Sequence, residues 1–277
     1  MDTRFWGPSG WKLLHLVAAD PLTPQRRAAV KEWLRLTEYI LPCKYCRASF
    51  HDYVQLQPLT DSILQNPAVF SRWMYDIHNR VNGKLRGQGL LTEVDPAWPT
   101  IRDHYKKLHA GLCTGSPLLG WDFMTSVAYS TPEKDYKQNP MPDTPEDLPT
   151  DLPTRNRYNL LTREERLDAL AAWWRLIPSI LPCEAWRSAW GRSMKRSPPL
   201  VQGRQAMMRW MWAVEKGVCG GLKCPTPHKS LPAMRHEVSA FESGCGVAKR
   251  GKTCRTRKTR QRDRVHRRRT RRGVEVL

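Results

Sequence analysis

The sequence lacks the features that mark membrane-inserted and secreted proteins. None of its 277 residues belongs to a run of eighteen or more apolar residues, so no membrane-spanning helix is expected. Its first residues, 1–6, do not show the charged-then-apolar pattern of a secretory signal peptide. We therefore expect a protein that is neither secreted nor inserted in a membrane.

Strand-like alternation is scarce as well, and helical patterns dominate. Apolar residues recur at helical spacing in several stretches, namely 24–40, 67–85, 99–108, 162–180 and 205–216. Thr23 before Pro24 is typical of a helix start, and Pro42 opens a helix that places Cys43 and Cys46 in its first turn. These patterns predict an all-α protein with a compact bundle of four or five helices in residues 1–112.

The chain is strongly basic, and the charge is concentrated at one end. Of the net charge of +20, residues 246–277 contribute +12, because they hold 14 Lys and Arg against two acids. Such a segment has little to bury, so we expect residues 236–277 to form a basic, disordered tail. A second helical domain is expected over 113–235, with a loop rich in proline, aspartate and threonine at about 131–159.

The two halves of the chain resemble each other, which indicates an internal duplication. The segment Ile40 to Arg47 (ILPCKYCR) is answered by Ile180 to Arg187 (ILPCEAWR). Two further pairs follow the same order, Arg72-Trp73-Met74 with Arg209-Trp210-Met211 and Trp11 with Trp121. The alternative is coincidence within a helical protein that is rich in tryptophan.

The second copy differs from the first where chemistry would matter. Its counterparts of Cys46, His15, His78 and Asn79 are Trp186, Thr125, Glu215 and Lys216. Packing residues are kept, whereas polar and redox residues are not. We therefore interpret the second half as a degenerate, non-catalytic copy.

Cys43 and Cys46 form a Cys-x-x-Cys pair at a helix start. The positive end of the helix lowers the pKa of a thiol there, which favours redox chemistry. The alternatives are half of a zinc site, a thioredoxin-like motif and an inert structural pair. The sequence has no second Cys-x-x-Cys to complete a zinc site and no βαβ pattern around the pair. The spacing alone leaves a redox pair and a structural pair equally open.

The cysteine pair belongs to a series of three motifs that follow one another along the chain. They are Gly7-Pro8-Ser9-Gly10-Trp11-Lys12-Leu13-Leu14-His15, Leu41-Pro42-Cys43-Lys44-Tyr45-Cys46 and His78-Asn79-Arg80-Val81-Asn82-Gly83-Lys84-Leu85. In this order they resemble the Erv/ALR family of FAD-linked sulfhydryl oxidases, over roughly residues 5–105. The resemblance implies a four-helix bundle with a short fifth helix that holds FAD at its mouth. In this chain the second, degenerate bundle and the basic tail would follow it.

The resemblance also implies the residues of the site. The redox pair is Cys43 and Cys46, and no metal is expected. Ten residues are expected to contact FAD, namely Gly7, Trp11, His15, Tyr75, His78, Asn79, Val81, Asn82, Lys84 and Trp98. His78 and Asn82 are four residues apart and share one face of a helix, as the wall of a cofactor site requires.

The implied reaction forms disulfides in protein substrates. A substrate dithiol would exchange with the Cys43–Cys46 disulfide, reaching Cys43 first, and Cys46 would pass two electrons to FAD. Oxygen would then accept the electrons and give hydrogen peroxide. The expected partners are protein dithiols, with a thioredoxin-like relay as an option, and oxygen.

Other cysteines depart from the family pattern or leave choices open. Tyr75 stands where cellular members often carry a cysteine of a structural disulfide, so that disulfide is expected to be absent. Candidates for the distal cysteine pair that relays electrons in many members are Cys245 with Cys254 and Cys219 with Cys224. The second of these pairs, with His228, is also a candidate for part of a zinc site.

An active copy fused to a degenerate one resembles some enzymes of large DNA viruses and protists. It predicts a pseudo-dimer within one chain, leaves a further homodimer open, and places a viral protein in host cytoplasm or in the virion. The basic segment 249–272 predicts nucleic-acid binding through phosphate contacts or a nuclear-localisation signal. It also supports a rival interpretation, a non-catalytic nucleic-acid-binding virion or structural protein on an oxidase-derived scaffold. The presence of Cys46, His78 and Asn82 favours the enzyme.

Overall fold

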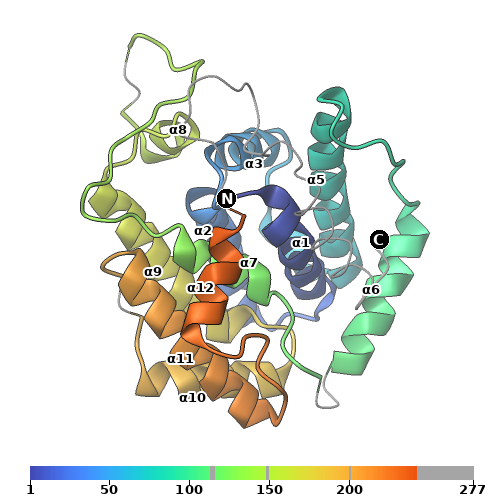
Figure 1. The fold of residues 1–277 in the computed structure, drawn as a ribbon. Coiled ribbons are helices and arrows are strands. Elements are labelled where there is room, and N and C mark those ends of the chain that lie inside the picture. The colour runs from blue at the N-terminus through green and yellow to red at the C-terminus, as the bar shows by residue number, and fades with distance from the viewer. Residues whose placement is uncertain (113–115, 148–149, 200, 242–277) are drawn as a thin grey trace.

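A computed structural model describes residues 1–112, 116–147, 150–199 and 201–241, and within these ranges all regular structure is helical (Figure 1). The prediction of an all-α protein is therefore confirmed. The helices of the first half are α1 (Thr3–Ala19), α2 (Pro24–Ile40), α3 (Lys44–Leu56), α4 (Asp61–Gln65), α5 (Pro67–Gly87) and α6 (Trp98–Leu112). The short α4 was not predicted, and α6 is longer than the predicted 99–108 at both ends.

The second half repeats the order of long helices found in the first. Its helices are α7 (Trp121–Tyr129), α8 (Leu152–Arg157), α9 (Arg163–Ile180), α10 (Glu184–Arg196), α11 (Arg204–Leu222) and α12 (Leu231–Ser239). The segment 131–159, predicted as a loop, contains the short α8. Helix α12 crosses the predicted start of the tail at 236, which is therefore too early, because Phe241 is still buried and stacks on Phe5. Most of the predicted tail lies outside the described residues.

The helices begin where the sequence provides capping side chains. Thr23 Oγ1 accepts a hydrogen bond from the backbone N–H of Arg26 at the start of α2. At the start of α9, Thr162 and Glu165 form a capping box, in which each side chain accepts from the other's backbone N–H. These local bonds satisfy N–H groups that a helix start leaves without partners. The starts of α2 and α9 therefore follow from sequence alone.

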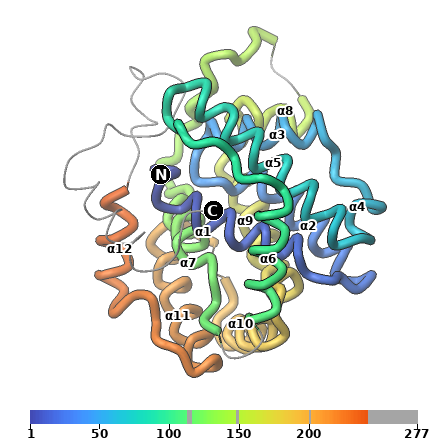
Figure 2. Tube along the Cα trace, turned by 90° about the vertical axis from the view of Figure 1, so that its right-hand side faces the viewer, coloured from blue at the N-terminus to red at the C-terminus, as the bar shows by residue number. Residues whose placement is uncertain are grey.

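One hydrophobic core runs through both halves of the chain. Helices α2 and α9 pack against each other (Figures 1 and 2), and the buried indoles of Trp33 and Trp173 stack between them. The two halves therefore share their interior instead of forming separately packed domains. None of the helices in the described ranges combines the length and apolar character that crossing a bilayer requires.

The contact between the halves is reciprocal, as in an isologous dimer. Arg26 Nε on α2 donates to the carbonyl oxygen of Ser179 at 3.0 Å, and Arg166 Nη1 on α9 donates to that of Tyr39 at 3.4 Å. With Ile40 answering Ile180, Arg26 is the counterpart of Arg166 and Tyr39 that of Ser179. The chain thus builds within itself a contact with approximate two-fold symmetry.

Candidate functional site

A cavity of about 860 Å³ opens between α1, α3 and α5 and is closed on one side by residues of the second half. All but one of the twelve residues predicted for the site line this cavity. They are Gly7, Trp11, His15, Cys43, Cys46, Tyr75, His78, Asn79, Val81, Asn82 and Lys84. The fold therefore brings residues from three separate motifs together in one cavity.

The cysteine pair lies at the start of α3. Cys43 is the N-cap residue of α3, so it lies one position before the first turn, where the sequence predicted it. Its Sγ accepts a hydrogen bond from the backbone N–H of Cys46 at 3.3 Å. Cys43 is only 2% exposed, whereas Cys46 is partly exposed. A Cys at an N-cap places its sulfur among the unpaired N–H groups of the helix start, where negative charge is stabilised.

The two thiols differ in acidity. Burial raises the pKa of the Cys43 thiol, but hydrogen bonds from Cys46 and the positive charges of the amino terminus and Arg47 outweigh it and lower that pKa to about 6. The hydrogen bond to Cys43 and burial together raise the pKa of Cys46 well above its usual range. In the reduced pair, Cys43 therefore carries the negative charge and Cys46 holds the proton.

Two helices place three aromatic rings on one wall of the cavity. The indole of Trp11 on α1 stacks on the imidazole of His78 on α5, with centroids 3.9 Å apart and planes 12° from parallel. His15 Nε2 lies 3.0 Å from His78 Nδ1. Burial lowers the pKa of His78 to about 4 and the pKa of His15 well below its usual range. Both imidazoles are neutral at pH 7, so one can donate to the other.

The polar residues of α5 are held by partners from other segments. Asn82 Nδ2 donates to Asp95 Oδ1 at 2.7 Å, and Arg86 forms an ion pair with the same carboxylate at 2.5 Å. Lys84 Nζ donates to the Ser49 hydroxyl on α3, which ties α5 to the helix that carries the cysteines. These bonds fix the direction of the side chains that border the cavity.

Trp98 is the predicted site residue that lies outside the cavity lining. It begins α6 and packs against Tyr75, with ring centroids 5.4 Å apart. The Tyr75 hydroxyl donates to the carbonyl oxygen of Pro96 at 2.8 Å, and the Arg72 guanidinium lies over both rings. Trp98 therefore supports the position of Tyr75, and a role for it beside a ligand stays a prediction.

Sequence reasoning missed several residues of the cavity. The buried Tyr105 on α6 stacks on His15 with centroids 4.5 Å apart. Tyr105 follows Ile101 by four residues, which indicates that both lie on the buried face of a helix. This spacing does not indicate a ligand site. The second half adds a stretch around the start of α7, Leu118 to Phe123, and also Phe241, two residues beyond the end of α12. Nothing in their local sequence indicates a site, because they reach it only through the packing of the two halves.

The cavity suits a large ligand that is both planar and polar. Besides the aromatic wall, it is lined by the cationic side chains of Lys12 and Lys84. Trp6 and Trp121 also line it, and their buried indole N–H groups have no hydrogen-bond partner among the described residues. A ligand in the cavity can supply acceptors for both donors, whereas Trp33, Trp174 and Trp190, whose indole N–H groups also lack partners among the described residues, do not line it.

The remaining cysteines add no metal centre among the described residues. No cluster of three or more potential ligands is found there, and His228 is engaged by Glu215 at 2.7 Å and Glu237 at 3.4 Å. The zinc alternative for Cys219, Cys224 and His228 therefore finds no support. Cys245 and Cys254 lie outside the described residues, so the choice of a distal relay pair stays open.

The first third of the chain is similar to proteins of a known family. Residues 8–99 match the sequence model of the Erv1/Alr family. A probable FAD-linked sulfhydryl oxidase of Acanthamoeba polyphaga mimivirus is 34% identical over 95 residues, which are 33% of this chain and 66% of that protein. The mitochondrial FAD-linked sulfhydryl oxidase of Saccharomyces cerevisiae is 37% identical over 89 residues, which are 31% of this chain and 45% of that protein.

A third relative is matched over most of its length. A protein of Invertebrate iridescent virus 6 is 32% identical over 100 residues, which are 34% of this chain and 89% of the viral protein. The chain spans just under two thirds of the mimivirus protein and less than half of the yeast protein. No solved structure matches the chain.

Proposed function

Because this chain belongs to the Erv1/Alr family, we propose that it is an FAD-dependent thiol oxidase that forms disulfides in protein substrates. One observation supports the proposal above all. The Cys43–Cys46 pair and the stacked rings of Trp11 and His78 line the same cavity, although they come from three different helices. A dithiol pair beside a flat aromatic wall is the arrangement that electron transfer from thiols to a flavin needs.

The residues present fit FAD. The stacked wall matches a flat ring system, Lys12 and Lys84 match phosphates, and the indole donors of Trp6 and Trp121 match its polar atoms. When bound, FAD would supply a two-electron acceptor that oxygen reoxidises with formation of hydrogen peroxide. We further propose Gly7, Asn79, Val81 and Asn82 as contacts, because they line the same cavity.

The chain's own part in the reaction is thiol–disulfide exchange. A substrate dithiol attacks the Cys43–Cys46 disulfide, and a mixed disulfide with the substrate forms while the other cysteine leaves as a thiol. The second substrate thiol then displaces the enzyme, which releases an oxidised substrate and a reduced pair. Two electrons and two protons have moved from substrate to enzyme.

The acidity difference within the pair supports an assignment of roles. Once a mixed disulfide has formed on Cys43, its pKa of about 6 makes Cys43 a good leaving thiolate when the second substrate thiol attacks, and the partly exposed Cys46 faces the cavity from the first turn of α3. We propose that the substrate forms its mixed disulfide with Cys43 and that Cys46 passes the electrons on. Because Cys43 is buried, this order requires the surrounding segments to move when a substrate binds.

Purification and oxygen consumption test the proposed activity. We expect a yellow protein with absorbance near ~450 nm that consumes oxygen in the presence of dithiothreitol. Cys46→Ser should keep its flavin and lose turnover. The matched control is Cys183→Ser, the counterpart of Cys43 at the N-cap of α10, which should keep turnover. A colourless protein that consumes no oxygen would refute the oxidase.

A trapping experiment tests the order of the cysteines. With a small protein whose single cysteine is held as a mixed disulfide with thionitrobenzoate, the Cys43 thiolate of Cys46→Ser should displace thionitrobenzoate and accumulate a mixed disulfide on Cys43, identified by mass spectrometry. Cys43→Ser should accumulate none. A mixed disulfide on Cys46 in Cys43→Ser, with none in Cys46→Ser, would reverse the assignment.

Protein dithiols and oxygen are the partners that this proposal requires. The rival function, nucleic-acid binding on a non-catalytic scaffold, rests on the basic segment 249–272, which lies outside the described residues. A thioredoxin-like relay, a further homodimer, and a place in host cytoplasm, virion or nucleus stay predictions from sequence. Relatives from large DNA viruses are consistent with a viral setting.

A further inference from the structure

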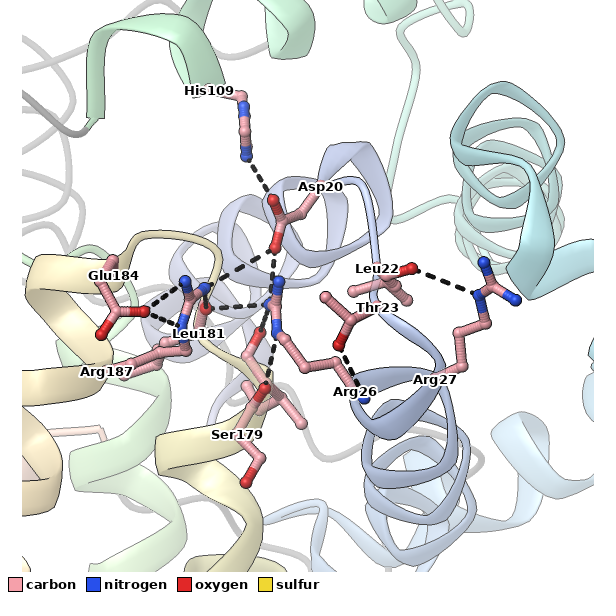
Figure 3. Close-up of polar contacts among 11 residues, drawn as sticks. Asp20, Leu22, Thr23, Arg26, Arg27, His109, Ser179, Leu181, Glu184 and Arg187 are labelled. Carbon is pink, nitrogen blue, oxygen red and sulfur yellow. Dashed lines mark hydrogen bonds and ion pairs between the residues drawn. The ribbon is translucent and has the colours of Figure 1, made fainter.

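Two equivalent clusters join the halves, and Figure 3 shows the first of them, which is centred on Asp20. The Asp20 carboxylate lies 2.5 Å from Arg26 Nη2 and 4.0 Å from Arg187 Nη1. His109 Nε2 lies 3.0 Å from its other oxygen. Arg187 also donates to the carbonyl oxygen of Leu181 and forms an ion pair with Glu184 at 2.7 Å.

The second cluster has the same layout but is centred on Asn159. The amide oxygen of Asn159 accepts from Arg47 Nη2 at 2.6 Å and from Arg166 Nη2 at 2.5 Å. Arg47 also donates to the carbonyl oxygen of Leu41, as its counterpart Arg187 does to Leu181. Asn159 precedes the N-cap of α9 by three residues, as Asp20 precedes the N-cap of α2.

The two clusters differ in charge. Around Asp20, two guanidinium groups meet two carboxylates, those of Asp20 and Glu184. In the other cluster, the neutral amide of Asn159 stands in place of the Asp20 carboxylate, and Lys44 stands in place of Glu184. Within the described part of the chain, the hydrogen bonds of Lys44 Nζ all go to oxygens of neutral groups, in Asn139 and Pro140. Among the described residues, these three cations (Lys44, Arg47 and Arg166) therefore gather without an ion pair to a carboxylate, and two of them, Lys44 and Arg47, lie within four residues of Cys43 on the same helix start.

Backbone conformation does not account for the asparagine. Asn159 has φ +61°, a left-handed conformation that asparagine and aspartate both tolerate. An aspartate would also pair with both guanidinium groups, as Asp20 forms ion pairs with Arg26 at 2.5 Å and with Arg187 at 4.0 Å. The asparagine therefore bridges the two arginines without neutralising them. Its amide nitrogen also donates to the carbonyl oxygen of Asn139.

We infer that the degenerate half tunes the redox pair: Asn159 and Arg166 hold Arg47 in an uncompensated cationic cluster that stabilises the Cys43 thiolate. Asn159 is a positioning residue in this scheme, because it acts through Arg47. The inference rests on the proposed function only in treating Cys43 as a redox thiol. In this scheme the second half takes part in the chemistry although it has Trp186 in place of Cys46.

The other charged groups near the pair come from several elements. The amino terminus and Asp2 lie before or at the start of α1, Lys44 and Arg47 lie on α3, and Lys84 on α5 faces Cys46. Burial and the charge of Arg166 lower the pKa of Arg47 to about 9, as expected for two guanidinium groups that share a neutral acceptor. Arg47 in turn lowers the pKa of Cys43.

Asn159→Asp tests the inference, with Asp20→Asn as its mirror-image control. In the reduced full-length protein, the rate of Cys43 alkylation by iodoacetamide is followed from pH 4 to 9 by peptide mass spectrometry. The new carboxylate should raise the pKa of the Cys43 thiol, seen as about fivefold slower alkylation at pH 6. It should also make the disulfide harder to reduce by glutathione, because the thiolate is less stabilised. Asp20→Asn should leave the Cys43 profile unchanged.

Each outcome bears on the inference. An unchanged profile in Asn159→Asp, or an equal shift in Asp20→Asn, would overturn it. Should Asn159→Asp fail to fold, Arg166→Gln removes one cation and keeps the amide, and the same slowing is expected there; normal alkylation in that variant would again overturn the inference. The alkylation is carried out without oxygen and needs no flavin, so a colourless protein would refute the proposed oxidase and still report on the cluster.

Discussion

The indoles of Trp33 and Trp173 stack at the centre of the contact between the two halves, with ring centroids 5.4 Å apart. They occupy equivalent positions on α2 and α9, and neither is exposed. Their surroundings are not equivalent. Trp173 Nε1 donates to the Thr37 hydroxyl at 3.1 Å, whereas Trp33 Nε1 has no partner among the described residues, because the counterpart of Thr37 is Ile177.

Removing this stack should destabilise the whole protein. Trp173→Ala deletes a fully buried indole and a buried hydrogen bond, so we expect the free energy of unfolding to fall by about 3–5 kcal/mol. Urea denaturation followed by far-UV circular dichroism measures it. Leu56→Ala, at a side chain that is 70% exposed, should change it by less than about 0.5 kcal/mol. If only half of the helical signal were lost at lower urea in Trp173→Ala, the shared core would be contradicted.

Gly120 is required by a close approach of α7 to α1. Its φ is +103°, and a Cβ at this position would lie 3.0 Å from Leu13 Cδ2. Gly120→Ala should therefore cost about 1–3 kcal/mol of stability. Gly191→Ala is the matched control inside α10, where no atom lies within 4 Å of the added Cβ, and it should stabilise the protein by about 0.5–1 kcal/mol. Equal effects of the two substitutions in thermal denaturation would contradict this account.

The neutral His78 makes stability depend on pH. Its pKa is about 4 in the folded protein, because of burial, and about 6.5 in the unfolded chain. Between these values the unfolded state binds more protons, so stability falls as the pH falls from 7 towards 4. For His78 alone the loss between pH 7 and pH 5 is about 2 kcal/mol.

Urea unfolding at pH 7 and pH 5 checks this expectation. His78→Gln should reduce the difference in unfolding free energy between the two pH values, and the exposed His236→Gln should not. The remaining difference in His78→Gln should include a contribution of the same sign from His15, whose pKa is also lowered by burial. An unaltered pH dependence in His78→Gln would show that this imidazole is not buried and neutral.

Glu215 and His228 form a buried polar pair in the second half. Glu215 accepts from the backbone N–H of His228 at 3.0 Å, and its other oxygen lies 2.7 Å from His228 Nδ1. His228→Ala should cost about 3 kcal/mol, because it leaves a buried carboxylate poorly paired. The double variant Glu215→Met with His228→Leu should be more stable than His228→Ala. A double variant that is less stable would indicate that the pair contributes net stability.

Much of the fold can be predicted from local sequence. The starts of α2 and α9 follow from Thr23 and Thr162, and the helical content follows from apolar spacing. The short α8 within 131–159 was missed, because six residues with Pro153 in the first turn carry too little periodicity to stand out. The end of the core at Phe241 was missed because its stacking partner, Phe5, lies at the other end of the chain.

The sequence by itself determined that Cys43 and Cys46 stand at a helix start, and it predicted their redox role and the set of side chains around them. Eleven of these twelve residues meet in one cavity, because the motifs that carry them lie on long helices whose faces are set by spacing. Cys46 and its counterpart Trp186 likewise predicted, without coordinates, that the redox chemistry belongs to the first half.

Only the tertiary structure brings residues of the second half to the helix that carries the cysteine pair. Asn159 and Arg166 lie more than a hundred residues after Arg47, and no local pattern links them to Cys43. Their contact depends on the reciprocal packing of α2 and α9, and the difference from the Asp20 cluster becomes visible only when the two are superposed as equivalents. The physical reason is that electrostatic effects depend on distances across the fold, whereas sequence periodicity reports only which face of a helix is buried.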